Sequence, residues 1–185
     1  MREIEIKLKV GNPGELEGKL AERGCALSAS IYQHDTVYVQ ADKADKAYRT
    51  KEGDIILRIR RLENGAEFTF KKQCSNEMDN IEYETEIGNP EAMHQILLVF
   101  GYVPQVEVKK IRRKGKIENY EVCLDKVEKL GDFMELEKIT KDDADPDETR
   151  EELFRVLESL GLFRNDEETK GYDTQVYQIN NASLI

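Results

Sequence analysis

Charged and apolar side chains alternate strictly along the first residues of the chain. Glu3, Glu5 and Lys7 occupy every second position, and the positions between them hold Ile4 and Ile6. Because successive side chains of a β-strand point to opposite faces, this pattern predicts a strand with one ionic face and one apolar face. Such an ionic face most often meets water, since antiparallel sheets commonly expose one side. If it instead lined a cavity, the carboxylates could hold a hard cation and the lysine a phosphate oxygen.

The same alternation recurs in later segments, and acids and bases fall on different predicted strands. The first strand and residues 132–139 are acidic on one face, whereas residues 55–62 and 105–113 are basic. A face in water would not need this segregation. We therefore expect a barrel whose apolar faces meet helices and whose ionic faces line a polar interior. Unpaired charges there would be costly, so an anion together with a metal ion is the expected occupant. The other predicted strands are 27–39, 66–73, 81–87 and 118–127.

Helices are expected where asparagine and proline stand together. Asn12-Pro13 and Asn89-Pro90 each place a capping side chain before a proline at the first helical position. Apolar residues at helical spacing follow, and Gly24 and Gly101 end these two helices. A third helix is predicted from about residue 145 to Gly161.

The two asparagine–proline pairs belong to a longer internal repeat. Aligning Gly11-Asn12-Pro13 with Gly88-Asn89-Pro90 places Glu82 on Glu5 and Glu84 on Lys7. The alternative is that this tripeptide is simply a good strand-to-helix junction used twice. We predict an α+β fold: a closed antiparallel β-barrel built from two repeated half-sheets, with helices packed outside. One domain is expected over residues 1–177, followed by a disordered tail over 178–185.

Polar segments predict the connections between these elements. Glu63-Asn64-Gly65 and Lys114-Gly115-Lys116 are predicted to be hairpin turns. Residues 41–54 are expected to form a mobile loop or a short helix, and residues 74–80 another loop.

Composition excludes several classes of protein. A net charge of −10 argues against a protein that coats nucleic acid. No apolar run approaches the roughly 20 residues of a membrane span, and the N-terminus lacks a secretory pattern. The three cysteines are isolated, so neither a thiolate zinc site nor a disulfide framework is expected, and a reducing cytoplasm fits best.

Taken in order, the motifs resemble those of the CYTH superfamily, the triphosphate tunnel metalloenzymes. Glu3-x-Glu5-x-Lys7 resembles the family's ExExK signature, and residues 124–137 are similar to the LDxVxxLGxFxExE stretch of its class IV adenylyl cyclase branch. Two segments depart from the family pattern: residues 35–39 keep only the start of a DxYFD-like segment, and Lys170-Gly171-Tyr172 stands for KSY. The remaining matches are Leu57–Arg61 for LRIR, Thr69–Lys71 for TxK, the acidic strand Glu82–Glu86, and Val108–Arg113 for KxR.

The resemblance implies roles for these residues. Lys7, Asp125 and Glu135 would lie nearest the chemistry, with Asp125 as a ligand or acid–base group. Glu84 or Glu86 would pair with the basic strands or contact a second metal. The triphosphate would be held by Lys7, Arg58, Arg60, Lys71, Lys110, Arg112 and, less directly, Lys170. The metal, Mg²⁺ or Mn²⁺, would be held by Glu3, Glu5, Glu135 and Glu137.

Three functions are compatible with this reading. The first is a class IV adenylyl cyclase-like enzyme that converts ATP to cyclic AMP and pyrophosphate. The second is a triphosphatase acting on inorganic triphosphate, thiamine triphosphate or a nucleotide. The third is a non-catalytic nucleotide or polyphosphate binding module, which the many carboxylates disfavour. The expected partner is a small-molecule triphosphate, without nucleic acid or membrane, and the resemblance suggests a homodimer.

Overall fold

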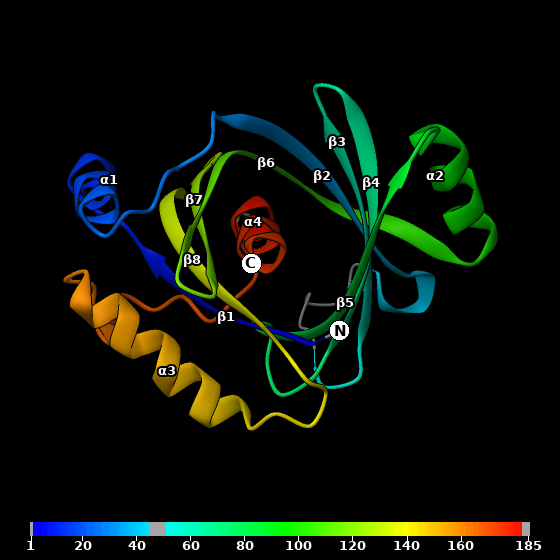
Figure 1. Cartoon of the computed structure of the whole chain (residues 1–185). Helices are drawn as coiled ribbons and strands as arrows, with labels where there is room; N and C mark the ends of the chain where they lie inside the picture. The colour runs from blue at the N-terminus through cyan, green and yellow to red at the C-terminus, as the bar shows by residue number, and fades with distance from the viewer. Residues whose placement is uncertain (1, 45–50, 183–185) are drawn as a thin grey trace.

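The computed structural model describes residues 2–44 and 51–182, and these form an eight-stranded closed barrel (Figure 1). Neighbouring strands are antiparallel throughout, in the order β1-β5-β4-β3-β2-β6-β7-β8. The predicted fold class is therefore confirmed. The strands are β1 Arg2–Lys9, β2 Ile31–Gln40, β3 Ile55–Leu62, β4 Gly65–Gln73, β5 Asp79–Ile87, β6 Tyr102–Ile117, β7 Tyr120–Val127 and β8 Gly131–Thr140.

The barrel contains two similar halves, as the repeat predicted. Each half runs strand, helix and three strands: β1 to β4 with α1, and β5 to β8 with α2. Exchanging the two halves strand for strand maps the closed ring onto itself, because β1 pairs with β8 just as β5 pairs with β4. The helices and 3₁₀ turns are α1 Pro13–Glu22, η1 Ala41–Lys43, α2 Pro90–Val99, α3 Pro146–Ser159, η2 Arg164–Asp166 and α4 Tyr172–Asn181.

The same capping chemistry begins α1 and α2. The side-chain oxygen of Asn12 accepts a hydrogen bond from the Glu15 amide at 3.3 Å, and that of Asn89 accepts one from the Ala92 amide at 2.9 Å. These bonds satisfy amides that a helix leaves unpaired in its first turn. Each first strand therefore passes directly into a helix on the outside of the barrel.

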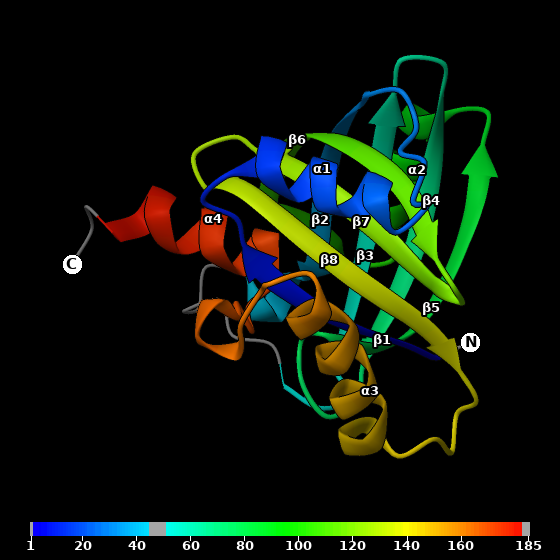
Figure 2. The same cartoon turned by 60° about the vertical axis from the view of Figure 1, so that its left-hand side comes forward.

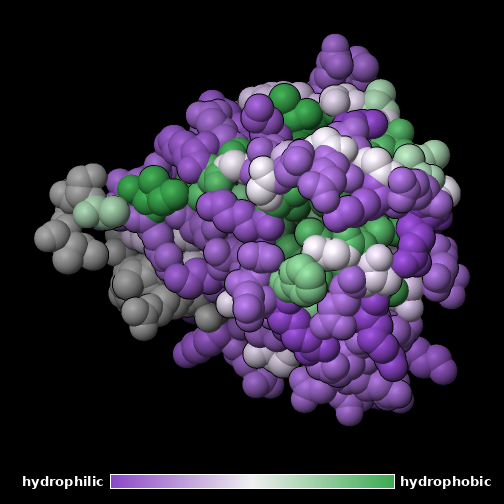
Figure 3. All heavy atoms as spheres, turned by 90° about the vertical axis from the view of Figure 1, so that its left-hand side faces the viewer, coloured by the Kyte–Doolittle hydropathy of each residue, from purple (hydrophilic) through white to green (hydrophobic). Residues whose placement is uncertain are grey.

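The apolar face of β1 packs against helices outside the barrel. Ile4, Ile6 and Leu8 are fully buried in one cluster with Leu20 of α1 and Leu157 of α3. Figures 1 and 2 show α1 and α3 on one side of the barrel and α2 on the other. The face that carries α1 and α3 is largely hydrophilic, with apolar side chains reaching the surface near its middle (Figure 3). Burial of one aliphatic side chain stabilises the fold by about 1.5–3 kcal/mol. Packing of the apolar face of β1 against the helices therefore turns its ionic face toward the inside of the barrel.

Helix α4 closes one end of the barrel (Figure 2). Its Tyr172 and Val176 pack against Val37, Val108 and Phe133. The prediction of a disordered tail over 178–185 is wrong for residues 178–181, which form the last turn of α4. Burial of Tyr172, Thr174 and Val176 stabilises the helix, and its largely polar, uncharged sequence did not reveal this. Residues 183–185 lie outside the described part of the chain.

One predicted turn is wrong. Lys114-Gly115-Lys116 lies inside β6 and pairs with β7, and the hairpin instead turns at Glu118, whose φ is 53°. Gly115 has a packing role: a Cβ atom there would lie 2.6 Å from the sulfur of Cys25. The turn at Glu63–Asn64 is confirmed, with Gly65 at the start of β4.

The loop predicted over 41–54 begins with the 3₁₀ turn η1, and its residues 45–50 lie outside the described part of the chain. Residues 74–80 connect β4 to β5, with β5 beginning at Asp79. Among the described residues, no helix is long and apolar enough to cross a bilayer.

Candidate active site in the barrel interior

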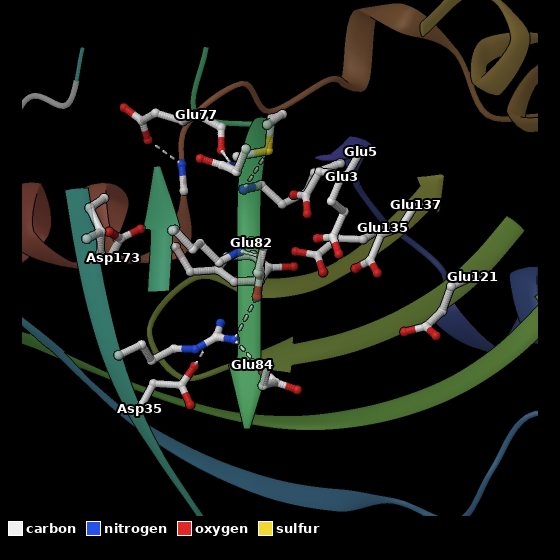
Figure 4. A pocket seen from close by; sticks show the side chains of 18 of the residues that line it. Glu3, Glu5, Asp35, Glu77, Glu82, Glu84, Glu121, Glu135, Glu137 and Asp173 are labelled. Atoms are coloured by element: carbon white, nitrogen blue, oxygen red, sulfur yellow. Dashed lines mark hydrogen bonds and ion pairs between the residues drawn. The ribbon is translucent and has the colours of Figure 1, made fainter. Parts of the chain in front are cut away.

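A cavity of about 440 Å³ lies inside the barrel. Glu3, Glu5 and Lys7 line it, so the ionic face of β1 is interior as predicted from the wider pattern. β8, which pairs with β1, contributes Glu135 and Glu137 to the lining. Figure 4 shows these carboxylates projecting from two adjacent strands toward one space.

Three carboxylates form an acidic wall, defined as Glu3, Glu5 and Glu137. One oxygen of each lies within 4.8 Å of the others. The β1–β8 register explains the proximity, because Glu5 lies directly opposite Glu137. Burial, reinforced by the neighbouring Glu135 carboxylate, raises the pKa of Glu5 to about 8. Burial and the charge of Glu3 also raise the pKa of Glu137 well above its ordinary value.

The donor set of this wall fits the expected cation. Mg²⁺ and Mn²⁺ prefer hard oxygen ligands, and the wall offers carboxylate oxygens without a thiolate or imidazole. Burial, reinforced by repulsion between the neighbouring carboxylates, is why Glu5 and Glu137 hold their protons so tightly. A divalent cation would relieve this repulsion and release the protons. Glu3, Glu5 and Glu137 are therefore the residues that could hold it.

Glu135 was predicted as a metal ligand, but its main partner is a cation. It lies beside the acidic wall and forms an ion pair with Arg112. Burial would raise the pKa of Glu135, but the charges of Arg112, Lys110 and Lys7 together outweigh burial and lower it. The structure thus keeps Glu135 ionised and directs it toward Arg112, outside the three-carboxylate cluster.

Three cations from β3 and β4 form a basic wall: Arg58, Arg60 and Lys71. Lys71 Nζ lies 2.6 Å from Glu82 Oε2, and Arg58 Nη2 lies 3.2 Å from Glu84 Oε2. Burial would lower the pKa of Lys71, but the charges of Glu82, Glu3 and Glu5 together outweigh burial and raise it. In the ring order β3 stands opposite β8, so cations and carboxylates face each other across the cavity.

The first clamp consists of Asp35 on β2 and Arg60 of the basic wall, and both residues line the cavity. The guanidinium donates Nε to Asp35 Oδ1 at 2.7 Å and Nη2 to Oδ2 at 2.8 Å. Burial would raise the pKa of Asp35, but Arg60 outweighs it, and the pKa lies well below its ordinary range. Asp35 was noted from the sequence only as part of a motif, although the alternation of β2 places it on the interior face.

The second clamp consists of Asp125 on β7 with Lys110 and Arg112 on β6. Asp125 Oδ2 accepts from Lys110 Nζ at 2.9 Å, and Oδ1 accepts from Arg112 Nε at 2.7 Å. Despite burial, these two cations lower the pKa of Asp125. Asp125 is 2 % exposed and lies behind the cations, away from the cavity surface. Asp125 orients Lys110 and Arg112 here, and its expected role as a metal ligand or acid–base group stays a prediction.

Lys7 differs from the other cations of the cavity. Its ammonium donates to the backbone carbonyl of Lys170 and lies 3.6 Å from the sulfur of Met78. It also lies 4.5 Å from the centre of the Tyr172 ring. No carboxylate of the described residues forms an ion pair with it. Its charge is therefore available to an anion.

Two predicted residues are not brought into the cavity. The side chain of Lys170 is exposed and donates to Gln178 Oε1 at 3.1 Å on the outside of α4. Glu86 is exposed near the end of β5, outside the lining, so Glu84 and Glu86 do not form a joint site. Glu84 itself lines the cavity and pairs with Arg58.

The sequence reasoning missed several lining residues. Lys114 and Lys116 continue the alternation of Lys110 and Arg112, but a turn was assigned to them. Glu121 follows the same parity on β7. Another group of missed residues comes from the 74–80 connection and the start of α4, where no periodicity exists to reveal them: Glu77, Met78, Gly171, Tyr172 and Asp173.

Comparison with known proteins agrees with this geometry. The CYTH domain family matches residues 1–172. A protein of Methanocaldococcus jannaschii named "Putative adenylate cyclase" is 30% identical over 174 residues, which cover 93% of this chain and 97% of that protein. A structure of a Pyrococcus horikoshii protein has a TM-score of 0.77 at 28% identity and covers 94% of this chain and 98% of its own.

A plant structure shares the fold at lower identity. It comes from Hippeastrum, with a TM-score of 0.61 and 18% identity, covering 97% of this chain and 95% of its own. Its description is a "Putative adenylyl cyclase" with "a dominant triphophatase activity". At this identity the likeness shows the fold alone.

Proposed function

Because the chain belongs to the CYTH family, we propose that it is a metal-dependent enzyme that cleaves a phosphoanhydride bond of a triphosphate. One observation carries the proposal: the acidic wall and the basic wall face each other across one cavity. A pure anion binder would gain nothing from three buried carboxylates. A cation on those carboxylates next to a chain of phosphates on the arginines and lysines uses both walls.

The residues of the chain divide the work by charge. Glu3, Glu5 and Glu137 would hold Mg²⁺ or Mn²⁺, which when bound neutralises charge on phosphate oxygens. Lys7 and the basic wall would hold the phosphate chain, and the second clamp would fix Lys110 and Arg112 in position. Phosphoryl transfer depends chiefly on such positioning and charge stabilisation, so no histidine or serine nucleophile is required.

The first candidate reaction is cyclisation of ATP. The ribose 3′-hydroxyl oxygen forms a bond to the α-phosphorus, the bond to the bridging oxygen breaks, and pyrophosphate leaves while the hydroxyl proton passes to water. The similarity of residues 124–137 to the class IV adenylyl cyclase branch supports this reaction, as does the name of the M. jannaschii relative.

The second candidate is hydrolysis, in which water attacks a terminal phosphorus and orthophosphate leaves. A specific observation favours it: among the described residues, Tyr172 is the single aromatic side chain that lines the cavity. Its ring already lies beside the ammonium groups of Lys7 and Lys110, so it has little free face for an adenine. The plant protein of the same fold is likewise described by a triphosphatase activity.

Product analysis separates the two reactions. The protein is incubated with ATP and with tripolyphosphate, each with Mg²⁺ or Mn²⁺, and the products are resolved by chromatography. Cyclic AMP and pyrophosphate without orthophosphate support the cyclase. Orthophosphate without cyclic AMP rules out the cyclase and supports the triphosphatase. No turnover of either compound would contradict the proposed function.

A further inference from the structure

Tyr172 carries a buried hydroxyl that has no hydrogen-bond partner among the described residues. It is the first residue of α4, it is 8 % exposed, and its side chain lines the cavity. Buried polar groups in proteins are nearly always paired, because leaving one unpaired is costly. A phenol at the wall of a cavity without a partner from the chain indicates that the partner is something the cavity binds.

The surroundings of Tyr172 specify the charge of that partner. Lys7 Nζ lies 4.5 Å and Lys110 Nζ 4.9 Å from the centre of its ring. Both ammonium groups are attracted to the ring, but they repel each other. An anion placed among the two ammonium groups and the phenol would meet three hydrogen-bond donors. Burial also raises the pKa of Tyr172 well above its ordinary value, so the hydroxyl keeps its proton and can donate.

The backbone around Tyr172 is held rigidly enough to form such a subsite. Glu77 accepts hydrogen bonds from the Gly171 amide at 2.6 Å and from Thr174 Oγ1 at 2.9 Å. Gly171 lies close to two side chains: a Cβ atom there would lie 2.3 Å from Asp173 Oδ1 and 3.3 Å from Glu77 Oε2, so a larger residue would require both side chains to shift. The ring of Tyr172 also packs edge-on against Phe133, with 5.2 Å between ring centres.

We propose that Tyr172 is a phosphate-binding residue, whose hydroxyl donates to an oxygen of the bound triphosphate between Lys7 and Lys110. This inference rests on the proposed function and deepens it. It also reassigns the C-terminal contribution to the site. The resemblance pointed to the Lys170 side chain, but that residue supplies only its carbonyl, which holds Lys7, while the residue two positions later reaches the cavity.

Calorimetric titration with tripolyphosphate, in EDTA and again with Mg²⁺, tests the assignment. Tyr172→Phe keeps the ring and removes only the hydroxyl. We expect it to bind about tenfold more weakly than wild type, the loss typical of one hydrogen bond to a charged group. Tyr172→Leu also removes the ring that positions the two lysines, and a further loss of about tenfold is expected. Tyr83→Phe, at an exposed tyrosine on the outside of β5, is the matched control.

Thermal unfolding of each variant separates binding from stability. Tyr172→Phe should unfold at nearly the wild-type temperature, and Lys170→Ala should bind tripolyphosphate within about twofold of wild type. If Tyr172→Phe binds as tightly as wild type, the hydroxyl meets water instead, and the assignment is overturned while the proposed function stands. A tenfold loss in Lys170→Ala alone would equally overturn it. Failure of wild type to bind tripolyphosphate under both conditions would overturn the proposed function as well.

Discussion

The two halves of the barrel hold the same kind of clamp with the charges exchanged between strands. In the first half the aspartate is on β2 and the arginine on β3, as Asp35 and Arg60. In the second half the cations are on β6 and the aspartate on β7, as Arg112 and Asp125. The two halves therefore have buried ion pairs at equivalent places in the ring. The strand that carries the carboxylate in one half carries the cation in the other.

The exchange gives the two clamps different neighbours. Arg60 of the first clamp stands beside Arg58 and Lys71, so this half presents a continuous basic wall. Arg112 of the second clamp reaches past Asp125 to Glu135 and Glu137 on β8, so this half joins cations to carboxylates. A duplicated half-sheet thus yields one side that suits phosphates and another that suits a phosphate with a metal ion.

The largest expected effect comes from the acidic wall beside the second clamp. Glu5→Gln should lower turnover of the preferred triphosphate by about a thousandfold, because a neutral amide neutralises no metal charge. Stability in EDTA should change by less than about 1 kcal/mol, because a carboxyl with a pKa of about 8 is mostly protonated at neutral pH and resembles the amide. Steady-state kinetics and urea unfolding measure the two quantities.

Glu82→Gln is the matched change in the first half. Glu82 pairs with Lys71 in the basic wall and lies outside the three-carboxylate cluster. Its removal should leave Lys71 available and tighten tripolyphosphate binding. For the Glu5→Gln variant of the acidic wall, turnover equal to that of wild type would show that Glu5 does not hold the metal ion.

Stability should distinguish the two clamps themselves. Asp125→Asn removes the carboxylate that Lys110 and Arg112 share. Arg112 retains Glu135, but Lys110 keeps no ion-pair partner among the described residues, and we expect a loss of about 3–5 kcal/mol in the free energy of unfolding. Asp35→Asn should lower the free energy of unfolding by less, because Asp35 has only one close cation, Arg60. The second cation near Asp35 is Arg58, which lies 3.8 Å away and would keep its ion pair with Glu84. Urea unfolding of both variants tests the order. A larger loss in Asp35→Asn would mean that the first half holds the barrel together.

A smaller effect is expected on the pH dependence of stability. The pKa of Asp35 is below its ordinary value in the folded chain, since Arg60 outweighs burial. The unfolded chain binds a proton near pH 4 and the folded chain does not, so this group stabilises above that pH and its contribution is lost as pH falls further. The stability difference between wild type and Asp35→Asn should therefore narrow by up to about 1.4 kcal/mol per pH unit below about pH 4. If the difference in the free energy of unfolding between wild type and Asp35→Asn stayed constant down to about pH 3, protonation of Asp35 would not explain the loss of stability in acid.

The smallest effect is expected at the rim of the first half. Glu86 is exposed and outside the cavity lining, so Glu86→Gln should leave turnover and its Mg²⁺ dependence within about twofold of wild type. Metal-titrated kinetics measure both. A clear loss of Mg²⁺ dependence would restore the idea that Glu84 and Glu86 hold a second metal.

Strand alternation made most of the cavity predictable. The interior faces of β1, β3 and β8 follow from the period of two, and Glu5, Arg58 and Glu137 line the cavity accordingly. Prediction failed where a residue type is required by a contact with a segment that is distant in the sequence. Gly115 suggests a turn in isolation, but it is required by the sulfur of Cys25, which a different segment brings against it.

The C-terminal segment shows the same limit. A lysine in a family-like motif suggested a phosphate ligand at Lys170, but helix α4 turns that side chain outward and places Tyr172 in the barrel. Without periodicity the orientation of a short segment depends on what it packs against. The hydrogen bond from the Gly171 amide to Glu77 and the packing of Val176 decide it here.

The sequence by itself determined which side chains share a face and which strands carry which sign, because alternation is a local property of extended backbone. Tertiary structure decided which strands are neighbours. Only the β1–β8 pairing brings Glu5 opposite Glu137, and only closure of the ring sets the basic strand β3 across from them. The raised pKa of Glu5 and the lowered pKa of Asp125 arise from burial and from those non-local contacts, because charge interactions are stronger inside a protein than in water.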